Sequence, residues 1–160
     1  MLSKTTISAL RALVYLARQE EGTCLSPRRI AELLDESPTY LAKSLRYLVK
    51  ANVLRAEMGV RGGVRLAQRP EEITLLAVVE ACQGAIVGDY CESSRPQGSW
   101  CAFHQAALEL HNAIKGVLSG WTLAQLLLLP HAEASGDGVR DCVMGGIPSA
   151  RGQALTRIGT

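Results

Sequence analysis

The chain has 160 residues, a length that suits one domain or one domain with an appended element. Hydrophobic residues make up 48% of the sequence but aromatic residues only 4%, so a core has to be built from Leu, Val, Ile and Ala, which favours helices. No run approaches the roughly 18 apolar residues of a membrane span, and the N-terminus lacks a signal peptide's apolar segment. We therefore expect a cytoplasmic protein, with no membrane partner, whose five cysteines are reduced or metal-bound.

The net charge of +2 is unevenly distributed. Between residues 26 and 69, nine basic residues stand against four acidic ones, which gives this segment +5 and leaves −3 for the remainder. Basic charge gathered in one segment is what a phosphate-contacting surface needs. A solvated surface explains the same charge equally well, so the elements within the segment have to decide.

The first two helices are predicted from their caps. Ser3 can cap a helix that runs to about Arg18 and repeats apolar residues at helical spacing. Ser26-Pro27 is a capping residue followed by a proline at the first helical position, where the missing N–H costs little. This pair predicts a short second helix over about residues 27–34.

A third helix follows across a tight turn. Asp35-Glu36 makes the turn, and Ser37-Pro38 repeats the cap and proline, so the helix runs over about residues 38–51. Its apolar residues face inward, which leaves donors suited to base edges and phosphates on the other faces: Thr39, Tyr40, Lys43 and Arg46. Two short helices across a tight turn predict a helix-turn-helix, although an ordinary amphipathic helix has the same pattern.

A predicted β-hairpin favours the first interpretation. Residues 53–57 and 64–67 alternate like strands around a tip at residues 58–63. Gly62-Gly63 permits positive φ and a close approach of backbone to phosphate, and Arg61 is placed to enter the minor groove. The sequence therefore predicts a winged helix-turn-helix, a mainly α fold with a small β-hairpin wing.

A long helix is predicted after the wing unit. Thr74 can cap a helix over about residues 75–83, a loop follows, and the long helix begins at Cys101 and ends near Ser119. One face of it carries an apolar stripe at spacings of four, three, four and three: Phe103, Ala107, Leu110, Ile114 and Val117. Such a stripe is a packing seam, and a small wing domain cannot bury so long a helix by itself, which favours a dimer seam over a core within one chain.

These elements divide the chain into four parts. Residues 1–84 form the DNA-binding domain, residues 85–100 a sensor loop, and residues 101–130 the dimerisation helix with a short following helix. Residues 131–160 are rich in Gly, Ser and Ala without periodicity, and we expect a flexible tail.

Several segments together resemble the Rrf-two family of bacterial transcription regulators, of the IscR and NsrR type. The segments that carry the resemblance are Ile30-Ala31-Glu32, Ser37-Pro38-Thr39-Tyr40-Leu41, Arg61-Gly62-Gly63-Val64-Arg65-Leu66-Ala67, Pro70-Glu71-Glu72-Ile73-Thr74-Leu75 and Thr122-Leu123-Ala124-Gln125-Leu126. The resemblance implies a homodimer on double-stranded DNA with a pseudo-palindromic operator, its recognition helices in successive major grooves and its wings in the minor groove. The residues expected to contact DNA are Arg28, Ser37, Pro38, Thr39, Tyr40, Lys43, Arg46, Arg61, Gly62, Gly63 and Arg65.

The resemblance also implies an iron–sulfur cluster, which we expect to be of the 2Fe–2S type, in the loop before the dimer helix. The matching ligands are Cys91, Cys101 and His104. The family's loop generally holds three cysteines, and the middle one is missing here because residues 92–100 contain none. The fourth ligand is unknown. Cys82 is a candidate for it that burial as a small hydrophobe explains better.

The sequence leaves the control of DNA binding open. The leading hypothesis is a regulator whose cluster senses redox state, iron, oxygen or nitric oxide. The alternatives are a thiol–disulfide switch between Cys91 and Cys101, and a regulator without a cofactor. A zinc enzyme built on Cys91, Cys101 and His104 lacks a candidate general base, so we expect no enzyme. An adaptor that has lost DNA binding does not explain the basic wing.

Overall fold

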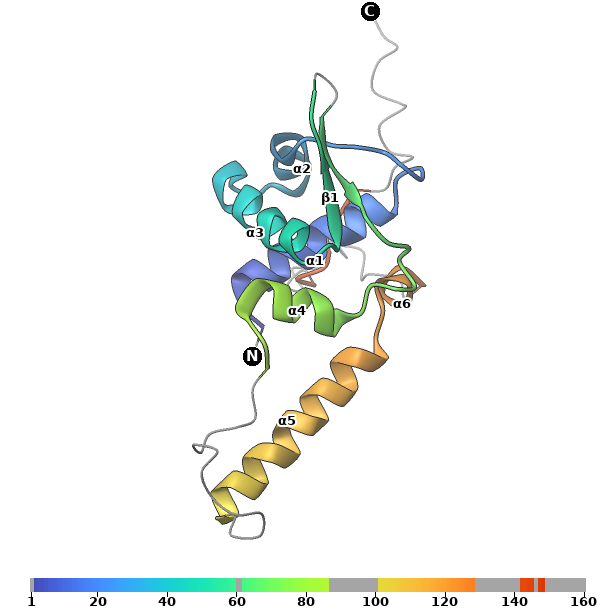
Figure 1. The fold of residues 1–160 in the computed structure, drawn as a ribbon. Coiled ribbons are helices and arrows are strands. Elements are labelled where there is room, and N and C mark those ends of the chain that lie inside the picture. The colour runs from blue at the N-terminus through green and yellow to red at the C-terminus, as the bar shows by residue number, and fades with distance from the viewer. Residues whose placement is uncertain (1, 60–61, 87–100, 129–141, 146, 149–160) are drawn as a thin grey trace, which may run out of the picture.

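The computed structural model describes residues 2–59, 62–86, 101–128, 142–145 and 147–148. Within these residues the chain folds into six helices and one hairpin: α1 (Lys4–Ala17), α2 (Pro27–Leu34), α3 (Pro38–Lys50), β1 (Leu54–Glu57), β2 (Gly63–Leu66), α4 (Leu75–Gln83), α5 (Ala102–Gly120) and α6 (Leu123–Leu128). Figure 1 shows a helical body topped by the hairpin, with α5 extending away from it as an arm. The predicted mainly α fold with a β-hairpin wing is confirmed.

The helices begin where the sequence places their caps. The hydroxyls of Ser3, Ser26 and Thr74 each accept a hydrogen bond from a backbone N–H in the first turn of α1, α2 and α4. Ser37 occupies the same position before α3, but its side chain makes no capping hydrogen bond. Asp35 ends α2 in the left-handed region at φ 53°, which makes the turn between α2 and α3 tight.

The hairpin is a two-stranded antiparallel sheet whose register runs from Leu54 opposite Leu66 to Glu57 opposite Gly63. A backbone bridge between Leu25 and Val64 fixes it to the body. A Cβ on Gly63 would lie 2.3 Å from the carbonyl oxygen of Leu25, so only glycine fits at this crossing. The expectation that Gly62-Gly63 supplies positive φ was wrong, because among the described wing residues only Gly59 has positive φ.

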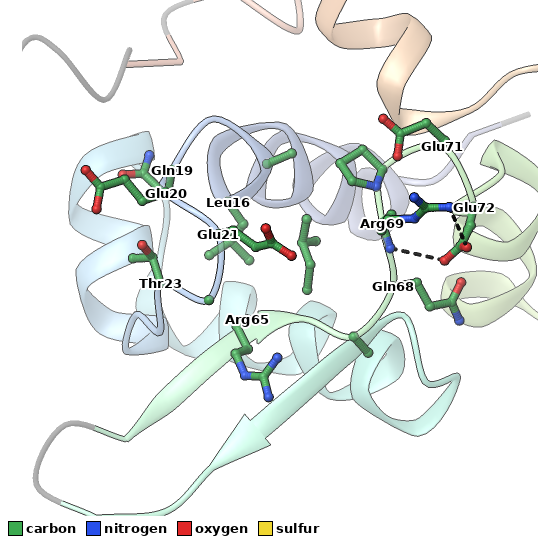
Figure 2. A pocket seen from close by; sticks show the side chains of 15 residues that line it. Leu16, Gln19, Glu20, Glu21, Thr23, Arg65, Gln68, Arg69, Glu71 and Glu72 are labelled. Carbon is green, nitrogen blue, oxygen red and sulfur yellow. Dashed lines mark hydrogen bonds and ion pairs between the residues drawn. The ribbon is translucent and has the colours of Figure 1, made fainter.

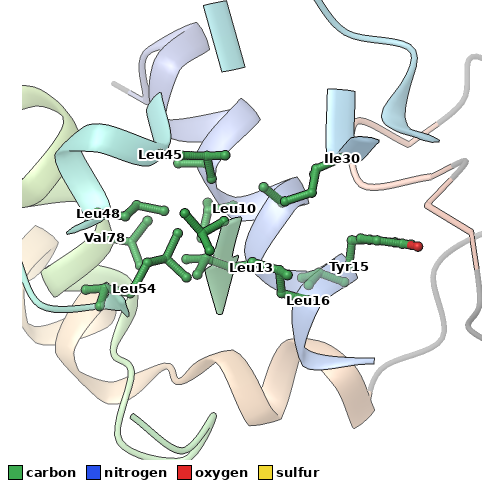
Figure 3. Packing of buried hydrophobic residues seen from close by; sticks show 14 of the residues in the cluster. Leu10, Leu13, Tyr15, Leu16, Ile30, Leu45, Leu48, Leu54 and Val78 are labelled. Atoms are coloured by element: carbon green, nitrogen blue, oxygen red, sulfur yellow. The ribbon is translucent and has the colours of Figure 1, made fainter. Parts of the chain in front are cut away.

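One hydrophobic core joins the first four helices to the hairpin. Leu13 of α1, Ile30 of α2, Leu45 of α3, Leu54 of β1 and Val78 of α4 are all buried and converge in this core (Figure 3). Each such aliphatic side chain contributes about 1.5–3 kcal/mol when fully buried. The core therefore fixes α3 and the wing relative to each other, which a DNA-binding surface requires.

Part of the C-terminal segment packs on this core. Ile147 is only 8% exposed, Met144 lies against the same cluster, and Nη1 of Arg18 donates to the carbonyl oxygen of Ile147 at 2.9 Å. Residues 142–145 and 147–148 fall in the segment that the sequence predicts to be a flexible tail. Single apolar residues in a Gly-rich segment have no periodicity, so the sequence carries no signal for this contact.

The C-terminal end of α5 is fixed to the body, while much of the apolar stripe along the helix is exposed. The backbone N–H of Leu75 donates to the carbonyl oxygen of Trp121 at 2.9 Å, and the N–H of Leu123 donates to that of Ile73 at 2.8 Å. Leu123 places α6 against the core. In the described part of the chain, no helix is long and apolar enough to cross a membrane.

Candidate nucleic-acid interface and cysteine site

Helix α3 is amphipathic in the way the sequence predicts. Leu41, Leu45 and Leu48 are buried. Exposed along its other side are Thr39, Tyr40, Lys43, Arg46 and Lys50. Lys50 was not among the residues predicted to contact DNA, but its spacing of four from Arg46 continues the same stripe, and that spacing is the signal that could have found it.

The turn before α3 is anchored to α1 by Glu36. Its carboxylate accepts a hydrogen bond from the hydroxyl of Ser8 and forms an ion pair with Arg11, whose Nε lies 3.4 Å from Oε1. The Arg11 guanidinium also donates to the carbonyl oxygen of Leu34, the last residue of α2, at 3.1 Å. Because Ser8 is buried and the ion pair is largely shielded, this cluster sets the orientation of the helix-turn-helix relative to α1.

Replacing Glu36 by Ala is expected to lower the free energy of unfolding by about 1–3 kcal/mol. The variant removes the carboxylate that accepts from Ser8 and balances Arg11. Thermal unfolding followed by circular dichroism measures the effect, and Glu32→Ala, which removes a carboxylate paired only at the exposed surface of α2, is the control. Equal stability losses in the two variants would show that Glu36 is not an anchor.

Further predicted DNA contacts lie at the start of α3 and in the first turn of α2. Ser37 and Pro38 are exposed, and the Ser37 hydroxyl is not used for capping. The side chain of Arg28 is exposed and forms an i,i+4 ion pair with Glu32, Nε to Oε1 at 3.2 Å. Tyr40 is 37% exposed, and its hydroxyl is hydrogen-bonded to Oγ1 of Thr5 at 3.0 Å. The structure therefore brings the predicted residues of α2 and α3 to adjoining positions of the helix-turn-helix.

Among its described residues, the wing presents fewer unpaired cationic side chains to DNA than the sequence predicts. Arg65 pairs across the hairpin with Glu57, Nε to Oε1 at 2.5 Å, so its guanidinium is already engaged. Gly62 and Gly63 are half-buried by backbone, and Arg61 lies outside the described residues. Arg55 of β1 is exposed and adds a cation to the hairpin that the list of predicted contacts did not include.

A groove of about 720 Å³ lies between the loop after α1 and the segment that follows β2. Figure 2 shows the pair of Arg69 and Glu72 at one side, Arg65 on the strand, and Glu21 between them. The groove thus has carboxylates and guanidiniums side by side, unlike the basic stripe on α3. We assign no role in DNA contact to it.

Two of the three predicted cluster ligands, Cys101 and His104, lie at the start of α5. Cys101 is the N-cap residue and is exposed, and its Sγ accepts from the backbone N–H of His104 at 3.4 Å. His104 is buried one turn into the helix. Cys91 lies outside the described residues, and the described residues alone bring together no group of three or more metal-ligating side chains.

The other cysteines do not complete this set within the described chain. Burial raises the pKa of the Cys82 thiol to about 11, and a hydrogen bond with the Thr6 side chain opposes the shift. Burial and the Glu57 carboxylate raise the pKa of Cys24, which lies in the loop between α1 and α2. Thiolates are the form that binds metals, so both shifts disfavour ligation.

Alkylation of Cys82 is expected to be slow because its pKa is raised and its side chain is partly buried. At pH 8, a thiol of pKa about 11 is ionised in only about one molecule per thousand, so iodoacetamide should label exposed Cys101 and Cys142 well before Cys82. Peptide mass spectrometry of the native, cofactor-free protein over time gives the order of labelling. Unfolded protein, in which all three thiols react alike, is the control, and equally fast labelling of Cys82 in the native protein would contradict its burial.

An anchored helix-turn-helix, an exposed basic stripe on its second helix and an adjacent hairpin define a winged helix-turn-helix DNA-binding protein. The family model described as Rrf2, iron-dependent transcriptional regulator, matches residues 2–128, and the chain belongs to this family. It is a DNA-binding transcription regulator and not an enzyme.

Known relatives agree with this assignment over most of the chain. Protein aau3 of Rhizobium meliloti is 32% identical over 130 residues, covering 79% of this chain and 84% of that protein. The regulator NsrR of Halalkalibacterium halodurans is 30% identical over 132 residues, covering 79% and 89%. The solved structure of the oxidized form of CymR from Staphylococcus aureus superimposes with a TM-score of 0.63 at 27% identity, covering 81% of this chain and 98% of that one.

Proposed function

We propose that the chain works as a homodimer that reads a pseudo-palindromic operator with two copies of α3. The observation that carries this proposal is the exposed polar and basic stripe of α3, formed by Thr39, Tyr40, Lys43 and Arg46. Within the described residues, neither Lys43 nor Arg46 forms an ion pair, so both cations are available to phosphates or base edges. The wing, with Arg55 and the predicted Arg61, follows the adjacent minor groove.

A second copy of the chain is the proposed partner of α5. Much of the apolar stripe of this helix is exposed among the residues that the structure describes, since Leu110 is 61% exposed and Val117 62%. A neighbouring side of the helix carries buried His104 and half-buried Leu108 and Leu118, so packing within the described residues uses that side and leaves most of the apolar stripe exposed. A helix pair from two copies would bury these side chains and set the distance between the two α3 helices.

We further propose that the start of α5 holds an iron–sulfur cluster that controls DNA affinity. The donor chemistry fits, because an exposed thiol and an imidazole lie within one helical turn at Cys101 and His104. Cys91 is the third proposed ligand. Such a cluster, when bound, supplies a group that responds to redox state, oxygen, iron supply or nitric oxide. Ligation by these residues would hold the 85–100 segment against the first turn of α5.

The cluster is tested by the absorption spectrum of anaerobically purified protein. We expect visible absorbance together with iron and acid-labile sulfide, and we expect Cys101→Ala to lose all three while its circular dichroism stays helical. Cys142→Ala, which removes an exposed thiol elsewhere, should retain the cofactor. Wild-type protein that contains neither iron nor sulfide would rule the cluster out.

A thiol switch is the second candidate, favoured by the exposed thiol of Cys101 and by the missing middle cysteine of the loop. In it, Cys91 and Cys101 form a disulfide under oxidising conditions and a dithiol under reducing ones. Differential alkylation with mass spectrometry, before and after oxidant, distinguishes it from the cluster. If the alkylation of both residues is unchanged by oxidant, this candidate is wrong.

A further inference from the structure

The first turn of α1 is hydrogen-bonded to the C-terminal end of α4. Gln83 is the last residue of α4, and its Oε1 accepts from the backbone N–H of Ser3 at 3.0 Å and from the hydroxyl of Thr6 at 3.1 Å. Figure 1 shows these two helix ends side by side. Residues 85–100, the predicted sensor segment, begin two residues after Gln83.

The same turn of α1 is hydrogen-bonded to the recognition helix. Oγ1 of Thr5 and the hydroxyl of Tyr40 lie 3.0 Å apart. Ser3 caps the turn by accepting from the N–H of Thr6 at 3.2 Å, and Thr6 is fully buried, so these residues form one ordered unit. One turn of helix thus contacts the end of α4 with Ser3 and Thr6, and the start of α3 with Thr5.

We propose that Gln83 is a positioning residue for Tyr40, and that it acts through the first turn of α1 and the hydroxyl of Thr5. This inference rests on the proposed function, in which Tyr40 contacts DNA. A displacement of the end of α4 moves the acceptor that holds Ser3 and Thr6. The hydroxyl that orients Tyr40 belongs to Thr5, which lies between these two residues in the sequence. Gln83 and the DNA-reading side chain of Tyr40 are then joined by hydrogen bonds to two sides of one turn of α1, whose backbone completes the connection.

Two donors converge on one oxygen atom of Gln83, which allows a sharp choice of variants. Gln83→Glu keeps an acceptor oxygen at the same reach, whereas Gln83→Met keeps the length and volume of the side chain but has no comparable acceptor. Gln19→Met is the matched control, since Gln19 lies just after α1 and its side-chain amide donates to the carbonyl oxygen of Tyr15 at 3.0 Å. Tyr40→Phe removes the other end of the connection.

The test is a double-mutant cycle on DNA affinity, with full-length protein in a fixed redox state and a duplex that the wild-type chain selects from a randomised pool. Gln83→Met and Tyr40→Phe are each expected to weaken binding about 3- to 10-fold, and the double variant should bind no more weakly than either one alone. Gln83→Glu should stay within about 2-fold of wild type, as should Gln19→Met. If Gln83→Met does not fold, Gln83→Asn, which withdraws the same amide by one methylene, takes its place in the cycle.

If the double variant loses DNA affinity by the product of the two single losses, the inference is overturned, because Gln83 then acts independently of Tyr40. An unchanged affinity of Gln83→Met or of Tyr40→Phe would overturn it too, as would a loss in Gln83→Glu or Gln19→Met equal to that in Gln83→Met. A wild-type chain that selects no DNA sequence would instead overturn the proposed function.

Discussion

Replacing both Lys43 and Arg46 by Ala is expected to weaken binding to the selected DNA duplex by at least about 100-fold. Both side chains are exposed on α3, on the side opposite buried Leu41, Leu45 and Leu48. A charged hydrogen bond to DNA contributes about 1–3 kcal/mol, and a dimer loses each of the two side chains twice. The variant should fold normally, because neither side chain takes part in the core.

The salt dependence of binding separates phosphate contacts from base contacts. If all four lost cations contact phosphates, the slope of log K against log salt should become shallower by about 3–4. Fluorescence anisotropy of the labelled duplex at several salt concentrations measures both quantities. Arg69→Ala removes a cation of equal charge from an exposed site beyond the wing and should change affinity by less than about 2-fold. If Arg46→Ala and Arg69→Ala lose equal DNA affinity, then only the net charge of the protein matters and α3 is not the helix that reads DNA.

Introducing Glu at both Leu110 and Val117 is expected to convert the dimer into a monomer. Both side chains lie in the exposed apolar stripe of α5, and each would contribute about 1.5–3 kcal/mol when buried against a second copy. Four charges would then lie in the interface without partners, so the dissociation constant of the dimer should rise by about 1,000-fold or more. Operator affinity should fall with it, because linking two binding sites strengthens binding by about 100- to 10,000-fold.

Sedimentation equilibrium gives the mass of the variant, and circular dichroism confirms that α5 still folds. The matched control is Gln105→Glu with Asn112→Glu, which adds the same two charges on the exposed side of α5 away from the apolar stripe. The control should remain dimeric and bind DNA. A stripe variant that stays dimeric would show that α5 is not the interface between the two copies.

The positions of the helices were predictable because their signals are local. Ser26-Pro27 and Ser37-Pro38 mark the starts of α2 and α3, and the inward leucines of α3 leave its polar stripe outside. The wing followed from strand-like alternation on both sides of a Gly-containing tip. In each case the residues that determine the structure lie within a few positions of one another.

The contacts that position the site were not predictable because their partners are far apart in sequence. Glu36 meets Ser8 across 28 residues, Thr5 meets Tyr40 across 35, and Gln83 meets Ser3 across 80. No local sequence pattern around these residues indicates which distant residue each one contacts. The requirement for Gly63 is of the same kind, since the atom that excludes a side chain there belongs to Leu25.

Selection of bound duplexes from a randomised DNA pool tests most directly whether the protein is a dimeric reader that uses α3. Two α3 helices held by paired α5 helices predict an enriched inverted repeat with half-site centres about 34–36 Å apart, one turn of DNA or a multiple of it. Each duplex should bind two protein chains, and Lys43→Ala with Arg46→Ala should enrich nothing. A pool that shows no enriched sequence, or a single unpaired half-site bound by one chain, would contradict the account.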